Sequence, residues 1–308
     1  MLKLQNLRGV AKPEYFFRPQ QIGLHLWREL VHGRTNETMR VRLPWGLDIN
    51  ADLTDGLGWS LYTRALYETA VTETLWRVTR PGDVVVDGGA NIGYMTSLLA
   101  RRAGKQGRIY SFEPHPETFA SLQRNVKSWE ASGRCGEFHP HQAALGDRDG
   151  VAALHVPEYF AQNRGTSTLD EKMAGGKDIE VRVMTLDHVI HEDDSVGVIK
   201  LDVQGHEIFV LQGMRELLRS RRVRNIVFEE EKRYPAETHE FLRTFGYQIF
   251  GIEQHFTGIR FVSNAQPCCD DIELPNYLAT IETDKTIGGL QSGLWQSFGP
   301  AQFFRWRE

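Results

Sequence analysis

The stretch from residue 84 to residue 93 constrains the fold of this chain more than any other. It reads Val-Val-Val-Asp-Gly-Gly-Ala-Asn-Ile-Gly. Three consecutive β-branched residues are typical of a strand covered on both faces, and the glycines let the following backbone pass close to a ligand because they carry no Cβ. Strand, glycine turn and helix start together predict a nucleotide site. The carboxylate of Asp87 at the strand tip would repel a pyrophosphate and attract the positive end of a ligand.

Composition places the chain among ordinary globular proteins. It has 308 residues, of which 41% are hydrophobic and 25% charged, and this is far from disordered or fibrous classes. A net charge of −4 predicts no nucleic-acid partner. The cysteines Cys135, Cys268 and Cys269 form no visible disulfide framework. Because no signal peptide and no apolar run of membrane-spanning length is visible, we expect a cytoplasmic protein without a transmembrane segment.

An extension over residues 1–64 is expected before the main domain. Apolar residues at helical spacing predict a helix over 21–32. Alternation over 39–43 and 47–49, broken by Pro44-Trp45-Gly46, predicts a β-hairpin. A helix over 58–79 leads into the buried strand and ends before Pro81-Gly82.

The main domain, residues 65–282, alternates strand and helix patterns. This order predicts a doubly wound, Rossmann-like α/β fold with a parallel sheet. Polar residues and short alternating pieces between about 150 and 186 predict an inserted β-hairpin with a loop over 157–180. The other expected elements are helix 92–103, strand 108–112, a helix from 116, strand 138–145, strand 196–201, helix 206–219, strand 225–228, helix 237–245 and paired late strands at 247–250 and 277–279.

Glu113 ends the second strand of this pattern, 20 residues after Gly93. An acidic residue there is placed to accept hydrogen bonds from the two hydroxyls of a ribose. The combination of glycine turn and acid favours a nucleotide site over a purely structural turn.

Three more polar residues follow later strands. Asp202 and His206 lie just after the fourth strand, and Glu229 closes the fifth. Ligands bind outside the carboxyl ends of the strands in an open parallel sheet, so we expect these side chains in the crevice that holds Asp87 and Glu113. Asp202 could instead cap a helix, His206 could be a structural histidine, and Glu229 could belong to a solvated acidic run. No dense cluster of metal ligands occurs at local spacing, so we expect no metal site.

Five motifs of the chain, in this order and spacing, resemble the FkbM family of S-adenosylmethionine-dependent methyltransferases. The resemblance covers roughly residues 65–280. The motifs are Asp87-Gly88-Gly89-Ala90-Asn91-Ile92-Gly93, Ser111-Phe112-Glu113-Pro114, Ala143-Ala144-Leu145-Gly146-Asp147, Thr185-Leu186-Asp187, and Ile199-Lys200-Leu201-Asp202-Val203-Gln204-Gly205-His206-Glu207.

The resemblance implies a class I methyltransferase fold, with a seven-stranded sheet whose last strand is antiparallel. It also implies O-methylation of a hydroxyl on a small molecule or sugar, with S-adenosylmethionine as the cofactor. The ammonium and sulfonium of that cofactor suit Asp87. The candidate cofactor residues are Asp87, Gly88, Gly89, Ala90, Asn91, Gly93, Glu113, Pro114, Ala144 and Leu145. At position 204 the family commonly has an acid where this chain has Gln204, which weakens a metal-dependent mechanism further.

The expected reaction aligns an acceptor oxygen with the methyl group and removes its proton. We predict that Asp202 or His206 receives the proton or orients the acceptor, with Glu229 as a weaker contributor. An NAD(P)-dependent oxidoreductase and a non-catalytic binding domain of the same fold are the alternatives. The tail over 283–308 contains Trp295, Phe298, Phe303, Phe304 and Trp306. It is expected to pack on the core, with a pocket wall or a homodimer contact as other options.

Overall fold

The computed structural model describes residues 37–160, 164–169, 175–232, 234–263, 267, 274–282, 284–291 and 293–298. The helix predicted over 21–32 and the tail residues Phe303, Phe304 and Trp306 lie outside these residues.

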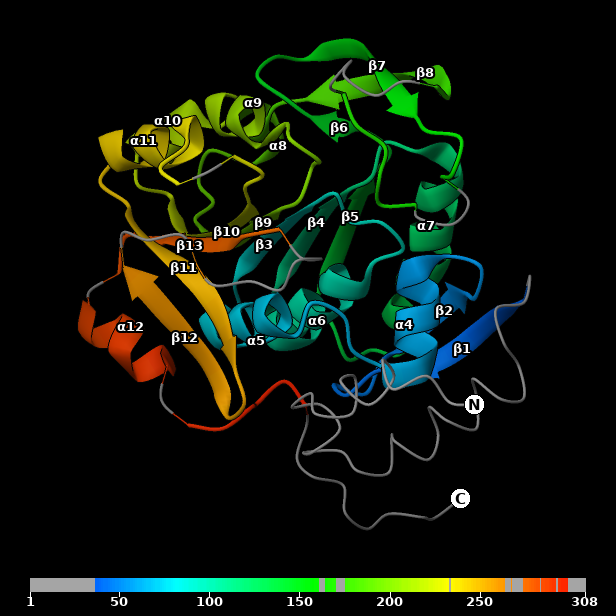
Figure 1. The fold of residues 1–308 in the computed structure, drawn as a ribbon, viewed down its shortest axis with the longest axis horizontal. Helices are drawn as coiled ribbons and strands as arrows, with labels where there is room; N and C mark the ends of the chain where they lie inside the picture. The colour runs from blue at the N-terminus through cyan, green and yellow to red at the C-terminus, as the bar shows by residue number, and fades with distance from the viewer. Residues whose placement is uncertain are drawn as a thin grey trace, which may run out of the picture.

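A mixed sheet forms the centre of the molecule (Figure 1). Its strands are β3 (Val84–Gly88), β4 (Arg108–Phe112), β5 (Glu137–His141), β9 (Val196–Leu201), β10 (Val223–Glu229), β11 (Gln248–His255), β12 (Gly258–Ser263) and β13 (Asn276–Thr280). They lie in the order β12-β11-β13-β10-β9-β3-β4-β5. The five from β5 to β10 are parallel, and β13 is antiparallel to both β10 and β11. This arrangement confirms the class I methyltransferase fold with its antiparallel last strand.

The sheet has eight strands rather than the expected seven. The additional strand, β12, pairs with β11 in an antiparallel hairpin. Ile259 and Phe261 of β12 are buried in the same apolar cluster as Phe250 and Ile252 of β11. The hairpin therefore extends the hydrophobic face of the sheet, which stabilises the extra strand.

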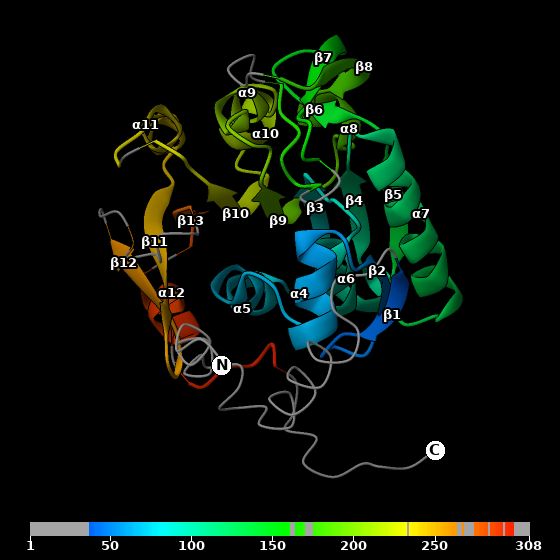
Figure 2. The same cartoon turned by 45° about the vertical axis from the view of Figure 1, so that its right-hand side comes forward.

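Helices cover both faces of the sheet (Figure 2). They are α4 (Gly56–Arg64), α5 (Thr69–Val78), α6 (Tyr94–Ala103), α7 (Pro116–Ala131), α8 (Leu186–Val189), α9 (Glu207–Gln212), α10 (Arg215–Arg219), α11 (Glu237–Thr244) and α12 (Asp284–Gln291). Apolar residues of α5, α6 and α7 share one cluster with Val85, while those of α9, α10 and α11 share another with Val84 and Val86. Because side chains alternate along a strand, β3 contributes to both layers.

Two helices predicted as continuous are divided. The helix expected over 58–79 consists of α4 and α5, and the turn between them holds Ala65 (φ 58°) and Glu68 (φ 40°) in the left-handed region. The helix expected over 206–219 consists of α9 and α10. At Gly213 between them, a Cβ would lie 1.9 Å from the carbonyl oxygen of Gly146. Close backbone approach therefore interrupts the second helix, which periodicity cannot show.

The strand expected over 138–145 is also divided. β5 ends at His141, and β6 (Ala144–Leu145) belongs to a separate sheet with β7 (Gly150–Val156) and β8 (Lys177–Met184). β7 and β8 pair in antiparallel fashion, which confirms the inserted hairpin. β1 (Thr38–Arg42) and β2 (Asp48–Asp52) form the predicted N-terminal hairpin.

Near its C-terminal end the chain packs against α5. Trp295 and Phe298 are buried, with stacked rings whose centroids are 4.8 Å apart. Glu73 and Arg77 of α5 form a buried ion pair of 2.5 Å. Glu73 also accepts the backbone N–H of Ser297 at 2.8 Å. The segment is thus held by both apolar and charged contacts.

Candidate active site

A cavity of about 390 Å³ lies at the carboxyl ends of β3, β4, β9 and β10. The insertion contributes residues 164–167 and Leu169 to its wall, and α4 and the turn before α5 contribute Gly56, Leu57, Tyr67 and Glu68. This is the place where open parallel sheets bind ligands. Of the predicted site residues, the cavity is lined by Gly89, Ala90, Asn91, Glu113, Pro114, Ala144, Leu145, Asp202, His206 and Glu229.

Gly89 allows the turn after β3 to pass β9 at close range. Its φ is +73°, and a Cβ there would lie 1.9 Å from the carbonyl oxygen of Asp202. The backbone N–H groups of Gly89 and Ala90 donate to the carbonyl of Phe112 at 3.1 and 2.9 Å. The turn is therefore fixed against two neighbouring strands and presents its backbone to the cavity.

Gly88 and Gly93 do not line the cavity and serve packing instead. A Cβ on Gly88 would lie 3.0 Å from the Leu145 side chain, and one on Gly93 would lie 2.7 Å from Leu122. Two of the glycines predicted to bind the cofactor thus make room for neighbouring side chains.

Asp87 lies behind the cavity wall. It is fully buried, and its Oδ2 accepts a hydrogen bond from Thr96 Oγ1 at 2.5 Å. Lys200 Nζ lies 3.7 Å from its Oδ1. Burial raises the pKa of Asp87, while Lys200 and Thr96 favour its ionised form. Asp87 therefore pairs with Lys200, which does line the cavity, and does not line the cavity itself as the sequence predicted.

Lys200 was not among the predicted site residues, although the sequence contains a signal for it. It is the one charged residue in the buried strand β9, and buried lysines occur almost exclusively with partners. Its Nζ donates to the carbonyl of Gly89 and to Asp202 Oδ2, both at 3.2 Å. Burial opposes the charge of Lys200, but Asp202 and Asp87 outweigh it and raise the pKa.

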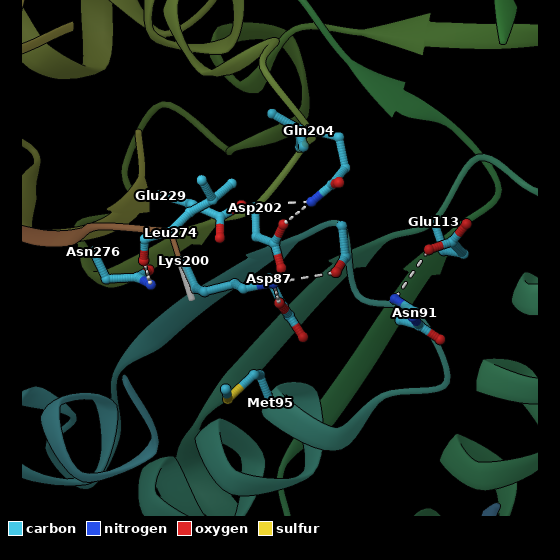
Figure 3. A network of polar contacts seen from close by, with 12 residues as sticks. Asp87, Asn91, Met95, Glu113, Lys200, Asp202, Gln204, Glu229, Leu274 and Asn276 are labelled. Atoms are coloured by element: carbon cyan, nitrogen blue, oxygen red, sulfur yellow. Dashed lines mark hydrogen bonds and ion pairs between the residues drawn. The ribbon is translucent and has the colours of Figure 1, made fainter. Parts of the chain in front are cut away.

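Glu113 stands at the opposite end of the cavity from Asp202 and Glu229 (Figure 3). One carboxylate oxygen accepts the N–H of Asn91 at 3.0 Å and the other that of His115 at 2.9 Å. Burial raises the pKa of Glu113 to about 7, against these hydrogen bonds. Each oxygen retains a second lone pair for a ligand hydroxyl.

Asp202, Gln204 and Glu229 form a polar group beside Lys200 (Figure 3). Gln204 Nε2 lies 2.8 Å from Asp202 Oδ1 and 3.5 Å from Glu229 Oε2. Burial, and then the charge of Asp202, raises the pKa of Glu229 well above its ordinary value. His206 also reaches the cavity, and its ring stacks on Phe209 with centroids 4.4 Å apart.

Tyr67, Glu68 and Arg164 were also missed by the sequence analysis. The charge of Glu68, and then burial, raises the pKa of the Tyr67 hydroxyl. Arg164 of the insertion lines the cavity, and its guanidinium donates to Asp52 at the end of β2 at 2.8 Å. Tyr67 and Glu68 belong to the turn between α4 and α5, and Arg164 belongs to the insertion. Neither segment has a sequence motif that would mark these residues as part of a site.

In the described part of the chain, no group of three or more His, Cys, Asp or Glu side chains is arranged to hold a metal ion. Among the same residues, no helix has the length and apolar character needed to cross a bilayer.

The family model for the methyltransferase FkbM domain matches residues 87–249, which is more than half of the chain. The chain belongs to the FkbM methyltransferase family. The matched region includes the glycine turn, Glu113, Asp202 and Glu229, whereas Gly56, Leu57, Tyr67 and Glu68 of the cavity wall precede it.

Two curated proteins that are similar to this chain have names that state a substrate. The 31-O-demethyl-FK506 methyltransferase FkbM of Streptomyces tacrolimicus is 32% identical over 44% of this chain and 61% of its own length. The hexuronic acid methyltransferase AglP of Haloferax volcanii is 29% identical over 50% of this chain and 59% of its own. The crystal structure of a methyltransferase FkbM from Methylobacillus flagellatus aligns over 71% of this chain and 52% of its own, at 17% identity and a TM-score of 0.38. The chain spans about 60% of the length of these two curated relatives.

Proposed function

We propose that this FkbM-family protein is an S-adenosylmethionine-dependent methyltransferase that acts on a hydroxyl group of a small molecule or sugar. The observation that carries the proposal is a single cavity that joins the glycine turn and Glu113 to Asp202 and Glu229. One end of it suits a nucleoside and the other a hydroxyl that must lose a proton.

The residues around the cavity fit the methyl donor. Glu113 would accept the ribose hydroxyls, because each of its oxygens already has one backbone donor and room for another. Ala144 and Leu145 would flank the adenine, and the turn at Gly89 would lie against the methionine end. That end carries a carboxylate, and the ammonium of Lys200 in the adjacent wall would attract it. When bound, S-adenosylmethionine supplies a methyl group activated by the positive charge on its sulfur.

Asp202 is the best placed side chain to take the proton of the acceptor. Lys200 and Gln204 each donate a hydrogen bond to it, which fixes the orientation of its carboxylate at the cavity wall. Glu229, whose pKa is raised by burial and by the charge of Asp202, lines the same cavity and would contact the acceptor beside Asp202. His206 remains the second candidate for the proton, because it lines the same cavity.

Calorimetry with S-adenosylhomocysteine and NAD tests the donor. We expect S-adenosylhomocysteine to bind about a hundredfold more tightly. Preferential binding of NAD would overturn the proposal in favour of an oxidoreductase. Transfer of a labelled methyl group to a panel of sugars and polyketide alcohols then tests the reaction. Tight binding without transfer to any acceptor of the panel would support the non-catalytic alternative.

A cytoplasmic location, a homodimer and the lack of a nucleic-acid partner stay predictions from the sequence. A small-molecule or glycan acceptor is part of the proposal. The substrates in the names of the two curated relatives, 31-O-demethyl-FK506 and a hexuronic acid, support this class of acceptor.

A further inference from the structure

Both oxygens of Asp202 are held by donors from its own chain neighbourhood (Figure 3). Oδ2 lies 3.2 Å from Lys200 Nζ, and Oδ1 lies 2.8 Å from Gln204 Nε2. The same Nε2 atom lies 3.5 Å from Oε2 of Glu229. One amide group therefore stands between two carboxylates that come from different strands.

Gln204 is held in this place by its backbone. Its φ is 55°, in the left-handed region that residues other than glycine rarely adopt. Its carbonyl accepts the hydroxyl of Thr168 at 2.8 Å, which ties it to the insertion. Such a conformation persists only where its surroundings impose it, and it is common at functional sites.

The charges around this amide are mainly negative. The titratable groups that interact with Asp202 or Glu229 are Lys200 of β9, Asp87 of β3, Tyr67 and Glu68 of the turn before α5, and Glu207 of α9. Carboxylates brought this close repel one another unless a proton, a metal ion or a donor lies between them. In this site the amide of Gln204 lies between Asp202 and Glu229, and the ammonium of Lys200 lies within ion-pair distance of both Asp202 and Asp87.

We propose that Gln204 is a positioning residue whose amide takes the place of a divalent cation between Asp202 and Glu229. The role of Asp202 as proton acceptor rests on the proposed function, whereas the bridging by Gln204 rests on the contacts alone. As a consequence, the two carboxylates keep a fixed spacing and Asp202 keeps a fixed orientation without any bound metal.

The substitution Gln204→Glu tests this inference, because it keeps the shape of the side chain and replaces the amide donor by a carboxyl group. At pH 5 the introduced group can carry a proton and still donate to Asp202. At pH 8 it must ionise against Asp202 and Glu229 or recruit a cation. We therefore expect the Tm gap between Q204E and the wild type to widen by about 3 °C or more from pH 5 to pH 8.

Manganese supplies the second readout. We expect millimolar MnCl₂ at pH 8 to close most of that gap, and Q204E to bind Mn²⁺ about tenfold or more tightly than the wild type by calorimetry. Gln248→Glu is the matched control, because it makes the same chemical change at an exposed position of β11. Its Tm should show neither the widening nor the response to manganese.

Gln204→Ala separates a positioning role from simple packing, since it removes the amide without adding a charge. Its Tm deficit should widen less from pH 5 to pH 8 than that of Q204E and respond less to MnCl₂, because two carboxylates rather than three then face one another. The inference is wrong if Q204E behaves like Q204A, if the wild type gains as much from manganese as Q204E, or if Q204E is unfolded at pH 5 where Q204A is folded. These outcomes do not depend on donor binding, so a protein that prefers NAD would refute the proposed function alone.

Discussion

Replacing Gly89 with alanine tests how closely the glycine turn must approach β9. The added Cβ would lie 1.9 Å from the carbonyl oxygen of Asp202, where ordinary contact begins at about 3.4 Å. Gly82 provides a matched control, since its φ is +84° and a Cβ there meets nothing within 4 Å. Both variants place alanine in a left-handed conformation, but only one introduces a clash.

The difference between the two variants measures the clash. Left-handed backbone costs roughly 1–2 kcal/mol for a residue other than glycine, and both variants share this cost. Forcing an atom into a packed position costs about 1–3 kcal/mol more. We therefore expect the free energy of unfolding of G89A to fall about 1–3 kcal/mol further than that of G82A. Because Gly89 lines the cavity, a shifted turn should also weaken binding of S-adenosylhomocysteine about tenfold, which corresponds to about 1.4 kcal/mol.

Urea unfolding and calorimetry with S-adenosylhomocysteine check these two expectations. The reasoning fails if G89A and G82A are equally stable and bind S-adenosylhomocysteine with the same affinity. A loss of affinity in G82A as large as that in G89A would also contradict it, because Gly82 lies outside the cavity wall.

Three further predictions concern the acid at each end of the cavity and the C-terminal segment. Burial raises the pKa of Glu113 to about 7, and a bound ribose favours the ionised form, so affinity for S-adenosylhomocysteine should rise from pH 6 to pH 8. A wild-type affinity that does not change with pH, or an E113Q variant whose affinity still rises, would contradict this. Asp202→Asn should lower methyl transfer by about a hundredfold or more while donor binding stays within a few-fold, as single-turnover kinetics and calorimetry can show. Arg77→Met leaves the buried Glu73 carboxylate without its cationic partner and should lower the free energy of unfolding in urea by about 3–5 kcal/mol. The double variant with Glu73→Gln should lose less than the two single variants combined, and full additivity would show that the two side chains do not stabilise each other.

The order of elements could be predicted from the sequence because hydrophobic periodicity reports which faces are buried. The three valines of β3 are an example, since they divide between the two apolar layers as alternation requires. The breaks in the two predicted helices, one at Gly213 and one at the turn that holds Ala65 and Glu68, could not be predicted. They result from contacts with distant segments, and periodicity contains no information on those.

The acids of the site were predicted because each follows a buried strand, and parallel strands end at one edge of the sheet. Glu113, Asp202 and Glu229 accordingly line one cavity. Asp87 could not be distinguished from them, since the burial that removes it from the cavity depends on the helix and the lysine packed around it.

The sequence by itself determined the doubly wound fold, the glycine turn and the edge of the sheet at which the acids meet. These are local properties, because they depend on residue type and spacing within single strands and turns. Only the tertiary structure decided that Lys200 lies between Asp87 and the cavity and that Gln204 bridges Asp202 and Glu229. Charges interact through space according to distance and burial, and both are known only after distant strands have packed together.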